Sequence, residues 1–174
     1  YVKNTIWPLI RKKLPKVEIH IYGAYQNEKI YQLNNKSKGF LIKGYAQNAI
    51  DTLQQYKILL APLRFGAGLK GKIFDAMHSS TPVAMSTIAS EGMFKDSSVY
   101  GFVEDDIHKY TQECARLYKT ERDWDRISKT NINLLQENYF YTAFAKALLL
   151  KISRIVLNQS LPVDQNNFFD RMLN

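Results

Sequence analysis

The sequence is poor in cysteine, glycine and proline, and it has no long uncharged hydrophobic run. Its single cysteine, Cys114, excludes an internal disulfide and a zinc site built on several cysteines, and it fits a reducing compartment. The most apolar stretch, residues 143–157, is interrupted by Lys146, Lys151 and Arg154, so we expect no segment that spans a bilayer. Only 8 glycines and 5 prolines among 174 residues exclude a collagen-like or low-complexity chain.

The sequence contains enough hydrophobic residues for one folded domain. Hydrophobic residues make up 45% of the chain and aromatic residues 13%, which is enough for a buried core. Basic residues outnumber acidic ones by 24 to 16, so the net charge is +8 and acidic partners must be considered. The densest basic cluster, Arg11 to Lys13 with Lys16, is typical either of a helix end or of a patch for acidic lipid or nucleic acid. No nucleic-acid-binding motif accompanies it, so we expect no nucleic-acid partner.

Helix-like and strand-like patterns alternate along the chain. The spacing of apolar residues predicts helices near residues 3–14, 26–34, 47–55, 71–79, 105–119, 122–137 and 140–158. Short apolar runs between them predict strands at residues 17–22, 40–42, 58–61, 82–85 and 99–103. Short strands separated by helices are typical of a parallel sheet that is covered on both faces. We therefore expect an α/β, Rossmann-like domain that ends in a C-terminal helical tail.

The two ends of the chain carry expectations of their own. Ile6, Leu9, Ile10 and Leu14 have helical spacing, and the first fourteen residues lack the shape of a signal peptide. Because there is also no initiator methionine, we expect an N-terminally truncated fragment of a longer protein. We place the domain at residues 1–158 and a poorly patterned tail at residues 159–174.

One segment, from Ala61 to Met77, points to a chemical role. A buried strand ends at Pro62, a loop punctuated by glycines follows, and a helix begins near residue 70 or 71. Ligands of open parallel sheets bind beyond the carboxyl ends of the strands, where this loop lies. Gly66, Gly68 and Gly71 allow the backbone to come close to a ligand and offer free N–H groups at a helix N-terminus. The segment therefore predicts an anion site.

Charged side chains in the first turn of that helix support the same prediction. Lys70 and Lys72 lie where the positive end of the helix dipole disfavours cations by roughly 0.3–1 kcal/mol each, and a bound phosphate would reverse that effect. Asp75 follows Lys72 by three residues, nearly on the same face, where it could accept hydrogen bonds from vicinal sugar hydroxyls. The alternative is an exposed Lys72–Asp75 ion pair on an ordinary surface helix, and the spacing alone does not decide between the two.

The block from Arg64 to Met77 resembles the C-terminal, donor-binding domain of GT-B glycosyltransferases, together with Thr81-Pro82-Val83 and residues 88–92. The likeness is greatest to the retaining enzymes that build bacterial surface polysaccharides, and it covers most of residues 6–157. It implies that the chain is one half of a GT-B fold and binds a nucleoside-diphosphate sugar. It also implies that a missing N-terminal domain holds the saccharide or lipid-linked acceptor, so we expect the chain alone to transfer nothing.

The resemblance implies roles for individual residues. Asp75 would hold the ribose hydroxyls, at a position where the family usually has glutamate, and Lys72 would neutralise the leaving phosphates. Arg64 is a further candidate phosphate ligand. The loop before the helix would contact phosphate or sugar through its backbone, at Gly66, Ala67, Gly68 and Leu69. Gly44 and Tyr45 would lie beside the base, and Glu91 would either approach the sugar or cap a helix.

The expected chemistry needs neither a metal nor a cofactor. His20, His78 and His108 are too scattered for a metal site, and members of the resembled family typically act without one. Backbone N–H groups, the helix dipole and Lys72 would stabilise the charge of the departing diphosphate. His20, in a strand, is expected to be structural, and no catalytic residue is assigned. The resemblance further implies a cytoplasmic protein, and it leaves open a peripheral contact with the inner face of the membrane.

Two other functions stay open on the sequence alone. One is a GT-B-like nucleotide-sugar epimerase, which uses the same donor site but no glycosyl acceptor. The other is a non-enzymatic, basic α/β module that binds anionic lipid or nucleic acid. Saturable binding of a nucleoside diphosphate that depends on Lys72 separates the two enzymes from this module.

Overall fold

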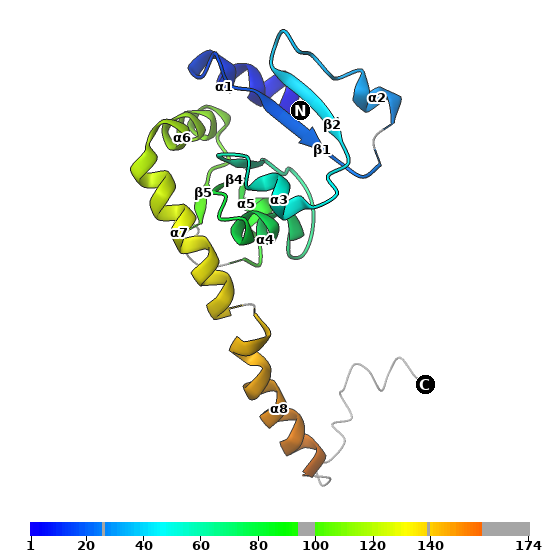
Figure 1. The fold of residues 1–174 in the computed structure, drawn as a ribbon, viewed down its shortest axis with the longest axis vertical. Helices are drawn as coiled ribbons and strands as arrows, with labels where there is room; N and C mark the ends of the chain where they lie inside the picture. Colours follow the sequence, from blue (N-terminus) through cyan, green and yellow to red (C-terminus); the bar gives the residue numbers. More distant parts are fainter. Residues whose placement is uncertain (26, 94–99, 139, 158–174) are drawn as a thin grey trace. The chain divides into compact units, whose positions relative to one another are not determined.

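The computed structural model describes residues 1–25, 27–93, 100–138 and 140–157 (Figure 1). Its elements are, in chain order, η1 (Val2–Ile6, a π-helical turn), α1 (Trp7–Lys13), β1 (Ile19–Tyr22), α2 (Glu28–Tyr31), β2 (Phe40–Gly44), α3 (Ala49–Leu53), β3 (Leu59–Ala61), α4 (Gly71–His78), β4 (Val83–Met85), α5 (Thr87–Ser90), β5 (Gly101–Val103), α6 (Ile107–Lys119), α7 (Glu121–Asn138) and α8 (Tyr141–Leu157). The predicted alternation is confirmed, and α5 is an additional short helix. Gln26, Val99 and the predicted tail at residues 159–174 lie outside the described residues.

The strands are parallel, and they form two sheets where the sequence pattern indicated one. In the first sheet β1 pairs with β2, so that Ile19 lies opposite Phe40 and Tyr22 lies opposite Gly44. In the second sheet β4 is central, between β3 and β5. Since parallel neighbours need a crossover between them, each connection runs through a helix or a long loop.

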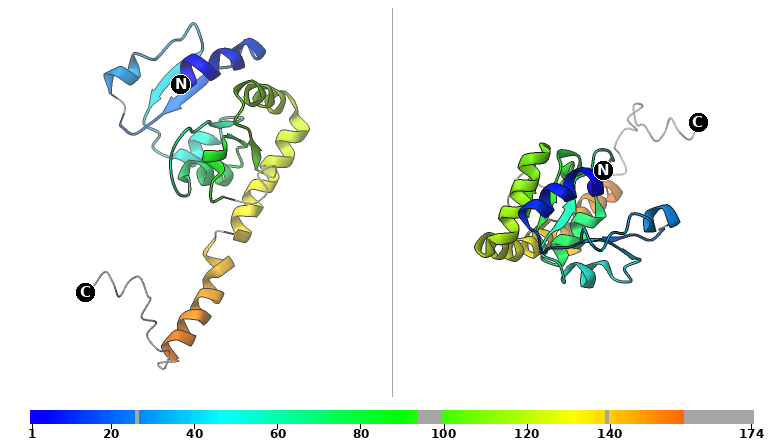
Figure 2. Two further views of the ribbon diagram at one scale, coloured as in Figure 1. Left: turned by 180° about the vertical axis from the view of Figure 1, so that it is seen from behind. Right: turned by 90° about the horizontal axis from the view of Figure 1, so that it is seen from above.

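Helices cover both sides of the sheets, as predicted (Figure 2). On one side α1 contacts α6, and their buried side chains form a core cluster with the strands. The cluster includes Ile6, Trp7, Ile10, Leu14, Ile19, Phe40, Ala84, Tyr110, Cys114 and Ala115. Burial in this cluster raises the pKa of the Cys114 thiol, so this cysteine is a packed core residue. Elsewhere α3 contacts α4, which is seated by the fully buried side chains of Ile73, Ala76 and Met77.

The chain divides into two compact units, Tyr1–Leu135 and a second that begins at Gln136. The first unit holds both sheets, and α7 is fixed to it by two hydrogen bonds to backbone carbonyls. Trp124 Nε1 donates to Lys57 at 2.6 Å, and Asn131 Nδ2 donates to Thr81 at 3.3 Å. The second unit holds α8, on which Leu148, Leu149, Leu150, Ile152, Ile155 and Val156 are exposed. Within the described ranges no helix has the length and apolar character that crossing a membrane requires.

Asp105 fixes the start of α5 from the loop that follows β5. Its carboxylate accepts hydrogen bonds from the Thr87 hydroxyl at 2.6 Å and from the Thr87 backbone N–H at 2.9 Å. These bonds hold the pKa of Asp105 below its usual value. A lowered pKa means that the folded chain binds this proton less tightly than the unfolded chain. The stabilisation is therefore present above the unfolded pKa of about 4 and is lost as the pH falls through the folded value.

We expect Asp105→Ala to lower the free energy of unfolding by about 1 kcal/mol at neutral pH, because two hydrogen bonds to an ionised group are lost. The deficit should shrink as the pH falls from about 4 through the lower pKa of the folded Asp105, because the carboxylate is then progressively protonated in the unmodified chain. Urea unfolding followed by circular dichroism measures both values. Asp125→Ala, which removes an exposed carboxylate of α7, serves as the control and should leave stability nearly unchanged. A deficit that is equally large in acid would contradict the assignment.

Candidate functional site

The candidate site lies at the N-terminal end of α4, where the loop after β3 turns into the helix. Gly66 and Gly68 have φ values of +138° and +65°, in the region that side-chain-bearing residues rarely adopt. The course of the loop therefore requires glycine at both positions. The whole segment from Arg64 to Leu69 is exposed, so its backbone is accessible to a ligand.

The start of α4 differs from that of α2, α3, α5 and α6. The helices α2, α3, α5 and α6 begin at a side chain that accepts a hydrogen bond from the first turn, namely Asn27, Asn48, Ser86 and Asp106. The N-cap of α4 is Lys70, and no side chain caps this helix. The N-terminal backbone groups of α4 thus keep the partial positive charge that attracts anions.

The two lysines of this turn have different environments. Lys70 is buried, and its Nζ donates a hydrogen bond back to the carbonyl of Gly68, so it holds the loop. Lys72 is exposed and leaves its ammonium at the surface of the helix start. The sequence pattern does not distinguish the two lysines, because spacing cannot show that Lys70 folds back. The structure leaves Lys72 as the cation that can meet a ligand.

Lys72 and Asp75 line one cavity of about 580 Å³. Residues of β1, α3 and β3 line it as well, so it lies between the facing edges of the two sheets. Asp75 is half-buried, one helical turn beyond Lys72. In the described part of the chain no ion pair joins these two side chains. The simple surface ion pair considered from the sequence is therefore not formed, and both charged groups can serve a ligand.

Arg64 lies outside the cavity of Lys72 and Asp75. Its guanidinium lies over the ring of Tyr1, at 4.6 Å from the ring centroid. It lines a second cavity of about 300 Å³, together with Ser86, Glu104 and Asp105. The structure therefore does not bring Arg64 into the cavity of Lys72 and Asp75.

The remaining predicted residues, Gly44, Tyr45 and Glu91, do not line the cavity of Lys72 and Asp75. Gly44 ends β2 with a φ of +81°, and Tyr45 after it has 67% of its surface exposed. Glu91 is exposed and stands at the C-cap position of α5, whereas Ser86 caps the N-terminus of that helix. The adjacent Gly92 lies against the loop, because a Cβ there would be 3.3 Å from Leu69 Cδ2.

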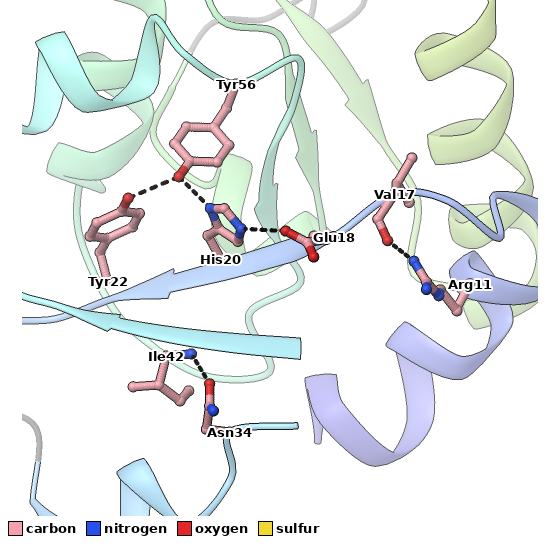
Figure 3. A network of polar contacts seen from close by, with 8 residues as sticks. All are labelled: Arg11, Val17, Glu18, His20, Tyr22, Asn34, Ile42 and Tyr56. Carbon is pink, nitrogen blue, oxygen red and sulfur yellow. Dashed lines mark hydrogen bonds and ion pairs between the residues drawn. The ribbon is translucent and has the colours of Figure 1, made fainter. Parts of the chain in front are cut away.

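A polar network along the β1 side of the cavity was not predicted as part of the site (Figure 3). His20 Nδ1 lies 2.6 Å from the Tyr56 hydroxyl, and His20 Nε2 lies 3.1 Å from Glu18 Oε2. The hydroxyls of Tyr22 and Tyr56 are 2.8 Å apart. Burial, together with the neighbouring Tyr22, raises the pKa of Tyr56, so its hydroxyl keeps its proton. Alternate residues of a strand share a face, and this spacing of Glu18, His20 and Tyr22 was the available signal.

The described residues include no group of three or more histidine, cysteine, aspartate or glutamate side chains that could hold a metal ion. His20 is engaged in the polar network, in keeping with its expected structural role.

Comparisons with known proteins bear on the family and the fold of the chain. The family described as "Glycosyl transferases group 1" matches residues 1–120. A solved structure of a mutant of S. aureus TarM, in complex with Fondaparinux, alpha-GlcNAc-glycerol and UDP, is similar in fold, with a TM-score of 0.71 and 18% identity. The match covers 86% of this chain and 31% of TarM. A second TarM structure gives a TM-score of 0.68 and 20% identity, over 83% of this chain and 30% of TarM. No curated protein matches the sequence.

Proposed function

We propose that this chain, which belongs to the group 1 glycosyl transferases, is the donor-binding part of an enzyme. The enzyme would transfer a sugar from a nucleoside-diphosphate sugar. The observation that carries this proposal is the joint placement of Lys72 and Asp75 in one cavity at the uncapped start of α4. The helix start and Lys72 suit a diphosphate, and the carboxylate suits the ribose hydroxyls.

In this proposal the chemistry is electrostatic. Breaking the bond between sugar and phosphate develops negative charge on the departing diphosphate. The N–H groups at the start of α4, its dipole and the Lys72 ammonium would stabilise that charge. The exposed glycine loop before α4 brings backbone groups to the same end of the helix.

We extend the proposal from this chain to the whole enzyme. The chain spans less than a third of the TarM structures that it resembles. We propose that a further domain holds the acceptor, a saccharide or a lipid-linked sugar, and that the 174 residues alone transfer nothing. We also propose a retaining reaction in bacterial surface-polysaccharide synthesis, on the cytoplasmic side and in peripheral contact with the membrane. The resemblance of the block from Arg64 to Met77 supports the proposed reaction, and UDP in the TarM complex supports a nucleotide donor.

Calorimetric titration with UDP, the nucleotide of the TarM complex, tests the proposal on the 174-residue chain. We expect saturable binding, and we expect Lys72→Ala to raise the dissociation constant by about tenfold or more, because a charge-assisted contact to phosphate is lost. Lys109→Ala removes another exposed lysine, on α6, and is the matched control.

The control should bind UDP as the unmodified chain does, since Lys109 lines neither cavity. Circular dichroism of both variants confirms that they are folded. No saturable binding by the unmodified chain, or equal losses in the two lysine variants, would contradict a donor site at α4.

A further inference from the structure

The contacts of the polar network assign a direction to its hydrogen bonds. The Glu18 carboxylate can only accept, so His20 Nε2 carries the proton that lies between them. In the neutral imidazole Nδ1 is then an acceptor, and it accepts the hydroxyl hydrogen of Tyr56. Tyr56 has no second hydrogen to give, so its oxygen accepts from the Tyr22 hydroxyl. Tyr22 is the last residue of this network. Its hydrogen is given to Tyr56, so its oxygen can only accept a further hydrogen bond.

The end of this network lies in the cavity of the proposed donor site. Tyr22 and Tyr56 line the same cavity as Lys72 and Asp75. If the phosphates lie at Lys72 and the ribose at Asp75, the base occupies another part of that cavity. The rings of Tyr22 and Tyr56 meet edge to face there, at 6.1 Å between centroids, and offer apolar surface to a flat ring. Tyr22 also lies directly opposite Gly44 in the sheet.

We propose that the Tyr22 hydroxyl oxygen reads the base of the donor nucleotide and selects a base that presents a ring N–H. Uracil presents such a group at N3, whereas cytosine presents a bare nitrogen that would face the Tyr22 lone pairs. Tyr56 and His20 act as positioning residues, because they fix which way the Tyr22 hydrogen points. This inference rests on the proposed donor site and adds its base specificity.

Calorimetry with UDP and CDP, at about pH 8, where imidazole is ordinarily neutral, tests the inference. We expect the unmodified chain to bind UDP about tenfold more tightly than CDP. Tyr22→Phe removes the acceptor, so the preference should fall to nearly none. Tyr56→Phe keeps the Tyr22 hydroxyl but removes the oxygen that holds the Tyr22 hydrogen in place. That hydrogen can then turn toward the base, so the preference for UDP should fall in this variant too. Tyr25→Phe, at a tyrosine with 96% of its surface exposed, is the matched control and should keep the full preference.

The ratio of the two affinities separates recognition from a merely structural role, because a loosened fold weakens UDP and CDP alike. The comparison of the two nucleotides on the unmodified chain needs no variant to fold. Lys72-dependent binding without a preference for UDP, or a preference that survives Tyr22→Phe, would overturn the base-reading role and leave the donor site standing. Absence of any saturable nucleotide binding would overturn both.

Discussion

Gly101→Ala is expected to cost about 4 kcal/mol or more in the free energy of unfolding, enough to prevent folding of the first unit. Gly101 lies opposite Val83, where β5 approaches the central strand β4. A Cβ at Gly101 would be 2.7 Å from the Val83 carbonyl carbon and closer still to its oxygen, whereas real Cβ atoms essentially never come within 3.0 Å of such neighbours. Val83 is fully buried and also pairs with Leu59 of β3, so it cannot move aside without disturbing both neighbours.

Thermal and urea unfolding of the purified variant, or its failure to accumulate as soluble protein, measures this effect. Gly71→Ala is the matched control, because a Cβ at Gly71 meets nothing within 4 Å. Its stability should stay within about 1 kcal/mol of the unmodified chain, since alanine fits an exposed helical position. A Gly101→Ala variant that melts with the unmodified chain would show that β5 does not pack against β4 as the structure has it.

The fold could be predicted from the sequence as far as its signals are local. Apolar runs and helical spacing located the strands and the longer helices to within a few residues. The helix α5 was not among the predicted helices, although its cap, Ser86, is visible in the sequence. The separation of β1 from β3 could not be predicted either. The cavity between these strands is lined by side chains such as Tyr56 that come from another part of the chain.

The same distinction between local and distant signals applies to the candidate site. Lys72 and Asp75 are three residues apart in one helix, so the expectation that they serve one ligand follows from local geometry, and the structure gives both to one cavity. Tyr56 meets His20 across 36 residues of sequence, a contact that no local pattern indicates. The stacking of Arg64 on Tyr1 is another such distant contact, and it takes this cation away from the cavity of Lys72.

We expect Ile73→Ala to lower both the stability of the domain and the affinity of the proposed site for UDP. Ile73 is fully buried and follows Lys72 directly, so it seats the first turn of α4. Removing three of its side-chain carbons should lower the free energy of unfolding by about 3 kcal/mol, whereas Ile73→Val should cost about 1 kcal/mol. If α4 presents the diphosphate site, UDP binding should weaken in the same order under conditions where each variant is still folded. Urea unfolding and calorimetry on the two variants measure both quantities. A stability loss with unchanged UDP affinity would show that nucleotide binding does not depend on the seating of this helix.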